Sequence, residues 1–292
     1  MSDIIYDYII AGSGIAGNVC AYLLAEKGNS CLILEKESVR KEKICGGGIS
    51  HTALMSLKNI GMNLDSLYSK NCKKIYGDMF CYNGDIKTHK YENYFSLGVQ
   101  RKIFDDFLSE QAVNMGCRIE YSQEVTEIKE YNGIYNINNF HAYNFICAVG
   151  ARGLSKKYLP FQSIGISGQI NGKCLLDDNI FYFWYDYNDR NSYFWMFPIG
   201  DSLWNVGIWS RFQRRDIRND FWKGFYNHVE NNFINGYLWS KKPTGEFLGI
   251  VNQTEDGIIG TGDFSGTCSE KNGGGIHYAI ASAIEIAKIR TC

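Results

Sequence analysis

The chain has 292 residues, of which 45% are hydrophobic and 21% charged, with a formal net charge of −1 at pH 7. This length suffices for one large domain or two modest ones with a buried core. A net charge near zero leaves no excess of basic residues to neutralise phosphates, which argues against nucleic acid as a partner. No apolar run approaches the roughly 18 residues of a membrane span, and Asp3 and Asp7 interrupt the region where a signal peptide would lie.

The 10 cysteines are scattered along the chain, without a CxxC pair and without the spacing typical of zinc sites. We therefore expect reduced thiols in a cytoplasmic protein, and no metal site. The unusual feature of the composition is the aromatic fraction of 15%.

The N-terminal segment predicts a strand, a tight turn, a helix and a second strand that Glu35 closes. The turn holds the pattern GxGxxG between the buried strand 6–11 and the helix, which Gly28 and Asn29 end. Glycines let a pyrophosphate approach the backbone, the helix N-terminus offers free N–H groups, and an acidic side chain accepts hydrogen bonds from a ribose. This context predicts a dinucleotide site. The predicted contact residues are Gly12, Gly14, Ile15, Ala16, Gly17, Glu35 and Lys36.

The next motif, "KICGGGIS", places Cys45 before the three adjacent glycines 46–48. Adjacent glycines raise the entropy cost of folding, so we expect another group to approach bare backbone there. Two interpretations of Cys45 stay open: a thiol that donates a proton to a substrate, or a small, soft residue that fits beside a ring. His51 is an alternative acid, or a local hydrogen-bonding group at a helix start.

The middle of the chain predicts two hairpins, with turns at Asn83-Gly84 and Asn132-Gly133. Between them a helix begins at Arg101, and "NFICAVGARG" (144–153) reads as a strand followed by a turn.

The segment 181–209 is crowded with aromatic residues whose alternation predicts antiparallel strands. Tyr193, Trp195 and Phe197 recur at strand spacing and therefore share one face, either as ordinary core or as the lining of an apolar substrate pocket. A helix follows, with a buried stripe at Ile217, Phe221, Phe225 and Val229.

The C-terminal segment 257–287 predicts a short strand, then Gly262-Asp263, a polar loop, the glycines 273–275 and a helix that begins at Ile276. An aspartate after a strand can bind a ribityl hydroxyl. N–H groups at the following helix start would lie near the pyrimidine edge of a flavin, where negative charge develops on reduction. The far end of the chain therefore favours FAD over NAD.

These motifs resemble the FAD oxidoreductases of the glutathione-reductase type, the superfamily of hydroxybenzoate hydroxylase, squalene epoxidase and geranylgeranyl reductase. The resemblance implies that Arg101 contacts FAD and that the flavin ring rests on the glycines 46–48. At the turn 148–150 the usual Asp-Gly is replaced by Val149-Gly150, so a cofactor contact at 149 is not implied. The further cofactor-binding residues so implied are Cys45, Gly46, Gly47, Gly48, Ala148, Gly150, Gly262, Asp263, Gly273, Gly274, Gly275 and Ile276.

The geranylgeranyl reductase family is the most similar branch, through "KICGGGIS", "YFWMFPIGD" (193–201) and the glycines after Gly262-Asp263. The resemblance implies an α/β fold: a Rossmann-like FAD-binding domain with an inserted antiparallel-sheet substrate domain. Members of this family usually continue past the last helix, so we expect a C-terminally shortened version. We assign 1–60, 98–160 and 250–292 to the FAD-binding domain, and 61–97 and 161–249 to the substrate domain.

The leading functional prediction is an FAD-dependent reductase that transfers hydride from flavin N5 to a C=C bond of an apolar small molecule. No second GxGxxG has a strand–helix context, so the electron donor is NAD(P)H bound transiently, or a separate reductase or ferredoxin.

Two alternatives stay open. One is an oxygen-activating monooxygenase or halogenase on an aromatic metabolite. "YFWMFP" resembles the halogenase pattern Trp-x-Trp-x-Ile-Pro, departing from it at Tyr193 and Phe197, and Lys73 or Lys74 would then be the halogenase lysine. The other is a non-catalytic FAD-binding subunit that needs a partner chain.

Overall fold

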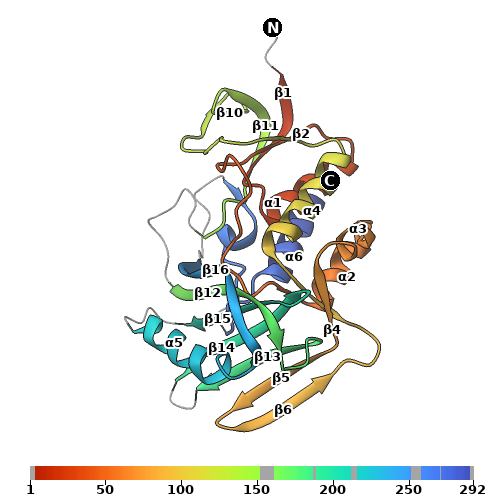
Figure 1. Cartoon of the computed structure of the whole chain (residues 1–292). Helices are drawn as coiled ribbons and strands as arrows, with labels where there is room; N and C mark the ends of the chain where they lie inside the picture. Colours follow the sequence, from red (N-terminus) through yellow and green to blue (C-terminus); the bar gives the residue numbers. More distant parts are fainter. Residues whose placement is uncertain are drawn as a thin grey trace.

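The computed structural model describes residues 4–151, 161–186, 189–211, 216–250, 258–269 and 271–289. Two large sheets lie at opposite ends of the molecule, with several helices beside the N-terminal one (Figure 1). The predicted α/β fold class is confirmed.

The first sheet is mostly parallel and has the order β8-β2-β1-β11-β10-β9, with β17 paired to β11. β1 pairs in parallel with both β2 and β11, so the loops that follow these strands open at one edge. The strands are β1 Ile5–Ala11, β2 Cys31–Leu34, β8 Arg118–Glu120, β9 Lys129–Tyr131, β10 Ile134–Ile137, β11 Phe140–Cys147 and β17 Ile259–Gly260.

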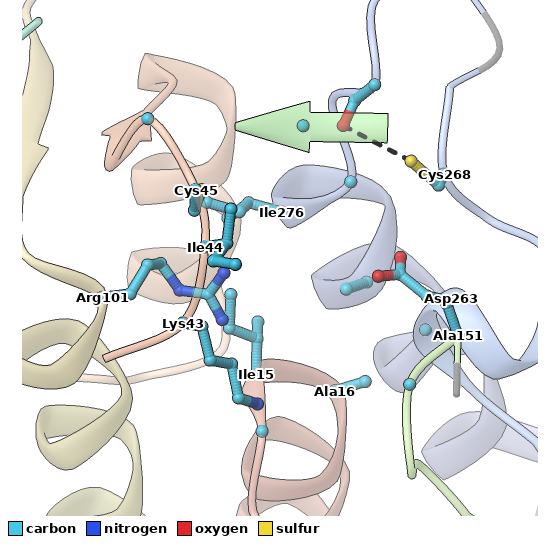
Figure 2. A pocket seen from close by; sticks show the side chains of 18 of the residues that line it. Ile15, Ala16, Lys43, Ile44, Cys45, Arg101, Ala151, Asp263, Cys268 and Ile276 are labelled. Atoms are coloured by element: carbon cyan, nitrogen blue, oxygen red, sulfur yellow. Dashed lines mark hydrogen bonds between the residues drawn. The ribbon is translucent and has the colours of Figure 1, made fainter. Parts of the chain in front are cut away.

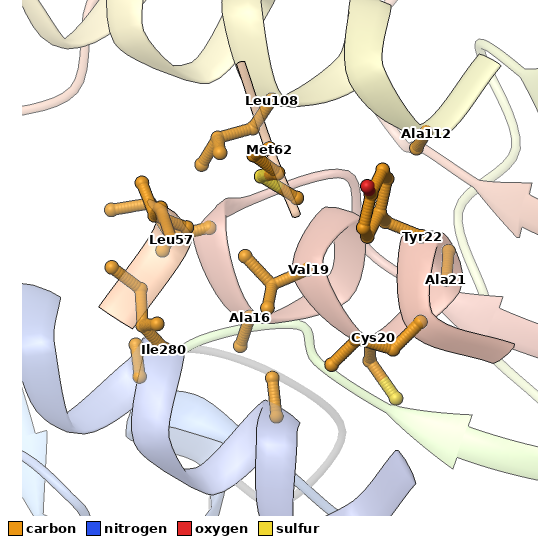
Figure 3. Packing of buried hydrophobic residues seen from close by; sticks show 14 of the residues in the cluster. Ala16, Val19, Cys20, Ala21, Tyr22, Leu57, Met62, Leu108, Ala112 and Ile280 are labelled. Atoms are coloured by element: carbon orange, nitrogen blue, oxygen red, sulfur yellow. The ribbon is translucent and has the colours of Figure 1, made fainter. Parts of the chain in front are cut away.

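Three helices pack together beside this sheet and bury a continuous apolar core (Figure 3). Val19 on the first of them, Leu108 on the second and Ile280 on the third each have 3% or less of their surface exposed. Within the described ranges, no helix is both long and apolar enough to cross a bilayer. The helices are α1 Ile15–Glu26, α4 Arg101–Asn114 and α6 Ile276–Ile289, with the shorter α2 His51–Asn59 and α3 Asp65–Tyr68 nearby.

The second sheet has the order β16-β12-β15-β14-β13-β5-β6. The neighbouring strands are antiparallel except β5 and β13, which run parallel. The helix α5 Ile217–His228 covers one face through Ile217, Phe221 and Phe225, as the four-residue spacing predicts. The strands are β5 Gly77–Tyr82, β6 Asp85–Lys90, β12 Phe161–Cys174, β13 Ile180–Asp186, β14 Asp189–Gly200, β15 Leu203–Ser210 and β16 Phe233–Ile250.

Both predicted hairpin turns are present. Asn83 and Gly84 have φ of 56° and 91°, and Asn132 and Gly133 have φ of 52° and 78°. Positive φ at both central residues is the conformation that matches the twist of the flanking strands, and Asn-Gly adopts it at low cost.

A small third sheet, β3-β7-β4, lies between the two large ones; it consists of β3 Gly48–Ile49, β4 Cys72–Ile75 and β7 Ser96–Val99. A Cβ on Gly98 of β7 would lie 1.8 Å from the carbonyl oxygen of Pro198 on β14, so these strands approach closely. The strands of each large sheet come from segments assigned to the matching domain, except that the last residue of β16, Ile250, falls on the other side of the boundary. The domain boundaries remain a proposal, and position 160 lies outside the described residues.

Candidate functional site

A cavity of about 1360 Å³ lies between the two large sheets. Ligand pockets usually measure about 300–1,000 Å³, so this one has room for a cofactor and a second molecule. Of the residues predicted from the sequence, those that line it are Gly12, Gly14, Ile15, Ala16, Glu35, Lys36, Cys45, Gly46, Gly48, Arg101, Ala148, Gly150, Tyr193, Trp195, Phe197, Gly262, Asp263, Gly273, Gly274, Gly275 and Ile276. The predicted residues that do not line it are Gly17, Gly47 and His51.

The glycines of the first turn have separate roles. A Cβ on Gly12 would lie 2.6 Å from Ala148 O, and one on Gly17 would lie 2.0 Å from Gly12 O. These two glycines therefore allow strand, turn and helix to pack closely. Gly14, like Gly12, lines the cavity, and α1 begins beside Gly14 without a side-chain cap. The N–H groups of the first turn of α1 thus lie where an anion can accept hydrogen bonds.

Glu35 follows β2 and is held in place by three hydrogen bonds. Its carboxylate accepts from Ser13 N at 2.9 Å, from Ser13 Oγ at 2.7 Å and from Glu37 N at 3.1 Å. Burial by itself raises the pKa of Glu35, but these bonds and the charge of Lys43 bring it below its ordinary value. The side chain is therefore an ionised acceptor at neutral pH, with lone pairs left for ribose hydroxyls.

The basic residues that line the cavity and that the sequence reasoning missed include Arg40 and Lys43. Lys43 Nζ would lie 2.9 Å from a Cβ on Gly14, so the ammonium group sits over the first turn of α1. The Arg40 guanidinium donates to Ser13 O at 2.8 Å and pairs with Asp106 at 2.7 Å. The charged run 40–43 was the only sequence feature that could have pointed to these two residues, and it does not match a known motif.

Arg101 opens α4 and points into the cavity (Figure 2). Its Nε and Nη2 each donate to the Asp105 carboxylate at 3.1 Å, one turn along the helix. Burial by itself lowers the pKa of Arg101, but Asp105 and the neighbouring Cys45 raise it above its ordinary value. Asp105, 1% exposed, is the matching buried carboxylate and also faces Lys43 at 3.6 Å. The ion pair therefore fixes a positive charge beside Cys45.

Glu42 joins this segment to helix α4 and to the second large sheet. Its carboxylate accepts from Arg101 N at 2.9 Å and Lys102 N at 3.0 Å, which satisfies the first turn of α4. The amide of Gln169 on β12 donates to the same side chain at 3.2 Å. The loop that carries Lys43 and Cys45 is thus fixed from both sides.

The glycines 46–48 are also needed for packing within the protein, and the predicted approach of the flavin ring stays a prediction. A Cβ on Gly46 would lie 2.7 Å from the Phe197 ring, and one on Gly48 would lie 3.2 Å from the Phe181 ring. Gly47 has φ +77°, and its Cβ would lie 2.4 Å from Val99 O. The side-chain positions face protein groups, so the glycines first allow this segment to pack onto the second sheet. Gly46 and Gly48 also line the cavity, whereas Gly47 does not.

Cys45 is half-buried and held through its backbone. Asn205 Nδ2 donates to Cys45 O at 2.8 Å, and Trp195 Nε1 donates to Asn205 Oδ1 at 2.8 Å. Gly47 N approaches the Cys45 sulfur at 3.5 Å. Figure 2 shows Cys45 on the same side of the cavity as Arg101, with Asp263 and Cys268 on the other side.

His51 is not brought to the cavity. Its Nδ1 lies 3.3 Å from Phe95 O, its ring centroid lies 4.6 Å from that of Tyr94, and its N–H donates to Ser96 Oγ. These contacts fit a local hydrogen-bonding group at the start of α2, and they do not support the alternative of a second acid.

The predicted aromatic face of β14 lines the cavity. Tyr193, Trp195 and Phe197 alternate with residues that pack beneath α5 on the opposite face. The Tyr193 hydroxyl donates to Asn272 O at 2.8 Å, and burial raises the pKa of Tyr193, so the phenol stays protonated. The same face carries Phe181, Phe183 and Trp209, which the sequence reasoning did not single out.

The C-terminal motif closes the opposite side of the cavity. Gly262 has φ +66°, and its Cβ would lie 2.9 Å from that of Ala16, so Asp263 comes close to the start of α1. Residues 273–276 place the N-terminus of α6 at the cavity as well. Burial, with Asp263 and Cys45 nearby, raises the pKa of Cys268 to about 12, so this thiol stays protonated.

The comparisons with known proteins agree with this geometry. The model of the family described as FAD binding domain matches residues 6–167. The digeranylgeranylglycerophospholipid reductase of Methanococcus vannielii is 25% identical over 303 residues, which cover 94% of this chain and 74% of that protein.

Solved structures of the same fold include a geranylgeranyl bacteriochlorophyll reductase-like protein from Thermoplasma acidophilum. It is 21% identical with a TM-score of 0.79, and the match covers 98% of this chain and 77% of that one. A flavin-dependent brominase is 18% identical with a TM-score of 0.77, over 99% and 80% of the two chains. Because the family model spans more than half of the chain, the chain belongs to the FAD binding domain family and is an FAD-dependent oxidoreductase.

Proposed function

We propose that this protein reduces a C=C bond of an apolar small molecule, with Cys45 as the proton donor. FAD, once bound and reduced by the electron donor, would supply the hydride. The observation that carries the proposal is the position of Cys45, which lies beside the Arg101 guanidinium and lines the same cavity as the aromatic face of β14. The 25% identity to a digeranylgeranylglycerophospholipid reductase supports a prenyl chain as the substrate class.

The residues around the cavity fit FAD from one end to the other. Glu35 would bind the adenosine ribose, and Lys43 with the first turn of α1 would bind the pyrophosphate. Asp263 would bind the ribityl chain, and the N-terminus of α6 would lie at the pyrimidine edge of the ring.

Cys45 can complete the reduction with a proton. Hydride addition to one alkene carbon leaves the other carbon in need of H⁺, and a thiol beside the substrate can donate it. The thiolate left behind would be stabilised by the guanidinium of Arg101, which Asp105 holds in place. Solvent then restores the thiol proton.

The aromatic face would bind the apolar body of the substrate. The side chains of Trp195, Phe197 and Phe181 each have 8% or less of their surface exposed. A preorganised apolar wall lets an unsaturated chain bind without loss of protein conformational entropy, and it keeps water from the reacting carbons.

The two candidate halogenase lysines are engaged elsewhere, which supports the reductase over the halogenase alternative. Lys73 pairs with Asp178 at 2.5 Å, and Lys74 Nζ lies 4.8 Å from the centroid of the Phe95 ring. Neither lysine lines the cavity. The electron donor remains NAD(P)H or a separate reductase or ferredoxin in this proposal.

The test is to reduce the bound flavin anaerobically and to mix it with farnesol or with oxygen. The proposal expects reoxidation by the alkene, with a product two hydrogen atoms heavier. Reoxidation by oxygen alone, with a hydroxylated or halogenated aromatic product, would sink the reductase proposal. A protein that eluted only as part of a larger complex and reduced nothing alone would favour the non-catalytic subunit.

A further inference from the structure

Asp78 and Tyr91 form a polar pair at the edge of the aromatic wall, the face of the second sheet that carries Phe181, Trp195 and Phe197. Both side chains line the cavity, and the Tyr91 hydroxyl donates a hydrogen bond to Asp78 Oδ2. Asp78 lies on β5 beside Phe181 of β13, and the Phe181 ring lies next to that of Phe197 on β14, with 4.4 Å between the centroids. A carboxylate therefore continues the row of rings across the sheet.

This carboxylate has no strong cationic partner. In the part of the chain that the structure describes, no lysine or arginine forms an ion pair with Asp78, and the charged group that acts on it is His89, its cross-strand partner on β6. Burial raises the pKa of Asp78, and the hydrogen bond from Tyr91 and the charge of His89 offset part of that effect. A half-buried carboxylate without a cation costs free energy unless a ligand or water satisfies it.

The orientation of Tyr91 is fixed from its other side. Its hydroxyl also interacts with Ser96, which is 7% exposed and accepts a hydrogen bond from His51 N at 3.3 Å. The ring of Tyr91 stacks on that of Tyr94 with 4.6 Å between the centroids. Tyr91 therefore holds Asp78 Oδ2, and the second carboxylate oxygen is left to accept from a ligand.

We propose that the Asp78–Tyr91 pair binds a hydrogen-bond donor, a hydroxyl or an ammonium, at one end of an otherwise apolar substrate. The aromatic wall takes the body of the molecule and the pair fixes which end enters. The inference rests on the proposed function in one respect, that this cavity is the one that binds the substrate.

The experiment measures binding to the FAD-loaded protein through the change in the visible absorption of the flavin. The probes are farnesol, farnesylamine and farnesyl methyl ether, which share one chain and differ in the donor. The wild type should bind the alcohol or the amine about tenfold more tightly than the ether. Asp78→Asn should remove that preference while leaving affinity for the ether unchanged.

Two further variants keep the test independent of folding. Tyr91→Phe keeps the ring and removes the hydroxyl that orients Asp78, so the preference should fall by about threefold. Tyr94→Phe is the matched control, because Tyr94 is 43% exposed, does not line the cavity and should leave all three affinities unchanged.

Three results would overturn the proposal. The wild type could bind all three probes equally, it could bind none of them, or its preference for a donor could survive Asp78→Asn. The readout needs no turnover. If the donor preference holds but reduced enzyme does not reduce farnesol, the proposed reaction fails while the assignment of the pair stands.

Discussion

The indole Nε1 of Trp195 donates a hydrogen bond to Asn205 Oδ1, with 2.8 Å between the atoms, across the neighbouring strands β14 and β15. The same amide donates to Cys45 O at 2.8 Å. One buried side chain therefore connects the aromatic wall to the segment that presents the thiol.

Replacing this amide should loosen that connection. Asn205→Leu leaves the indole N–H and the Cys45 carbonyl without their partner, which costs about 2 kcal/mol of unfolding free energy. Trp195→Phe removes only the first bond and serves as the comparison. Urea denaturation and FAD content check both. An Asn205→Leu protein as stable as the wild type would show that the amide does not hold the segment.

The two cysteines that face the cavity should differ in their contribution to the reaction. Cys45→Ser should keep FAD and lose at least about a hundredfold in turnover, the usual contribution of a positioned general acid. Cys268→Ser is the matched control, since this thiol lies across the cavity and should leave turnover near the wild-type value. Single-turnover flavin reoxidation with farnesol measures both. Similar turnover in all three proteins would show that Cys45 is a packing residue and does not donate the proton.

A comparison of alanine variants at Gly47 and Gly28 distinguishes the cost of steric overlap from the cost of backbone strain. Both have positive φ, but a Cβ at Gly28 meets nothing within 4 Å, whereas one at Gly47 lies 2.4 Å from Val99 O. Gly28→Ala should therefore cost about 1 kcal/mol, and Gly47→Ala should cost at least about 2 kcal/mol more. Chemical denaturation of the two variants gives the difference. Equal losses would mean that the overlap at Gly47 relaxes freely.

His228 should make stability fall in mild acid. Burial lowers its pKa to about 4, and its ring stacks on Trp184 with 4.4 Å between the centroids. A histidine that is harder to protonate when folded stabilises the protein fully above its unfolded pKa of about 6.5, and that contribution is lost as pH falls toward 4. At pH 5 the loss is at most about 2 kcal/mol.

His228→Phe keeps the ring and removes the titration. The difference in unfolding free energy between wild type and variant should therefore shift by that amount between pH 7 and pH 5. Parallel curves for the two proteins would show that His228 is not buried in its neutral form.

Local sequence patterns were sufficient to predict those elements whose structure depends on residues close together in the sequence. The glycine turn with Glu35, the helix that begins at Arg101 and the Asn-Gly hairpins depend on neighbours in sequence, and all are present. The FAD family could be predicted from the sequence for the same reason, because its motifs are short and have a fixed spacing.

Contacts between distant segments could not be read in this way. The sequence gives no sign that β5 lies parallel to β13, and without that register Asp78 cannot be placed beside Phe181. Lys43 reaches Gly14 from a loop that is held by contacts of Glu42 with residues far away in the sequence. The glycines 46–48 show the same limit. The pattern indicated a close approach, and only the fold shows that aromatic side chains approach Gly46 and Gly48 while the Val99 carbonyl approaches Gly47.

A crystal structure with FAD bound tests the central claim most directly, that one cavity holds the flavin ring beside Cys45 and leaves the aromatic wall to the substrate. The account predicts the pyrophosphate at Lys43 and Ile15, and the ring between Cys45 and the start of α6, with the thiol in contact with the ring or with the space next to it. A ring that lay outside this cavity, or one separated from Cys45 by protein, would contradict the account.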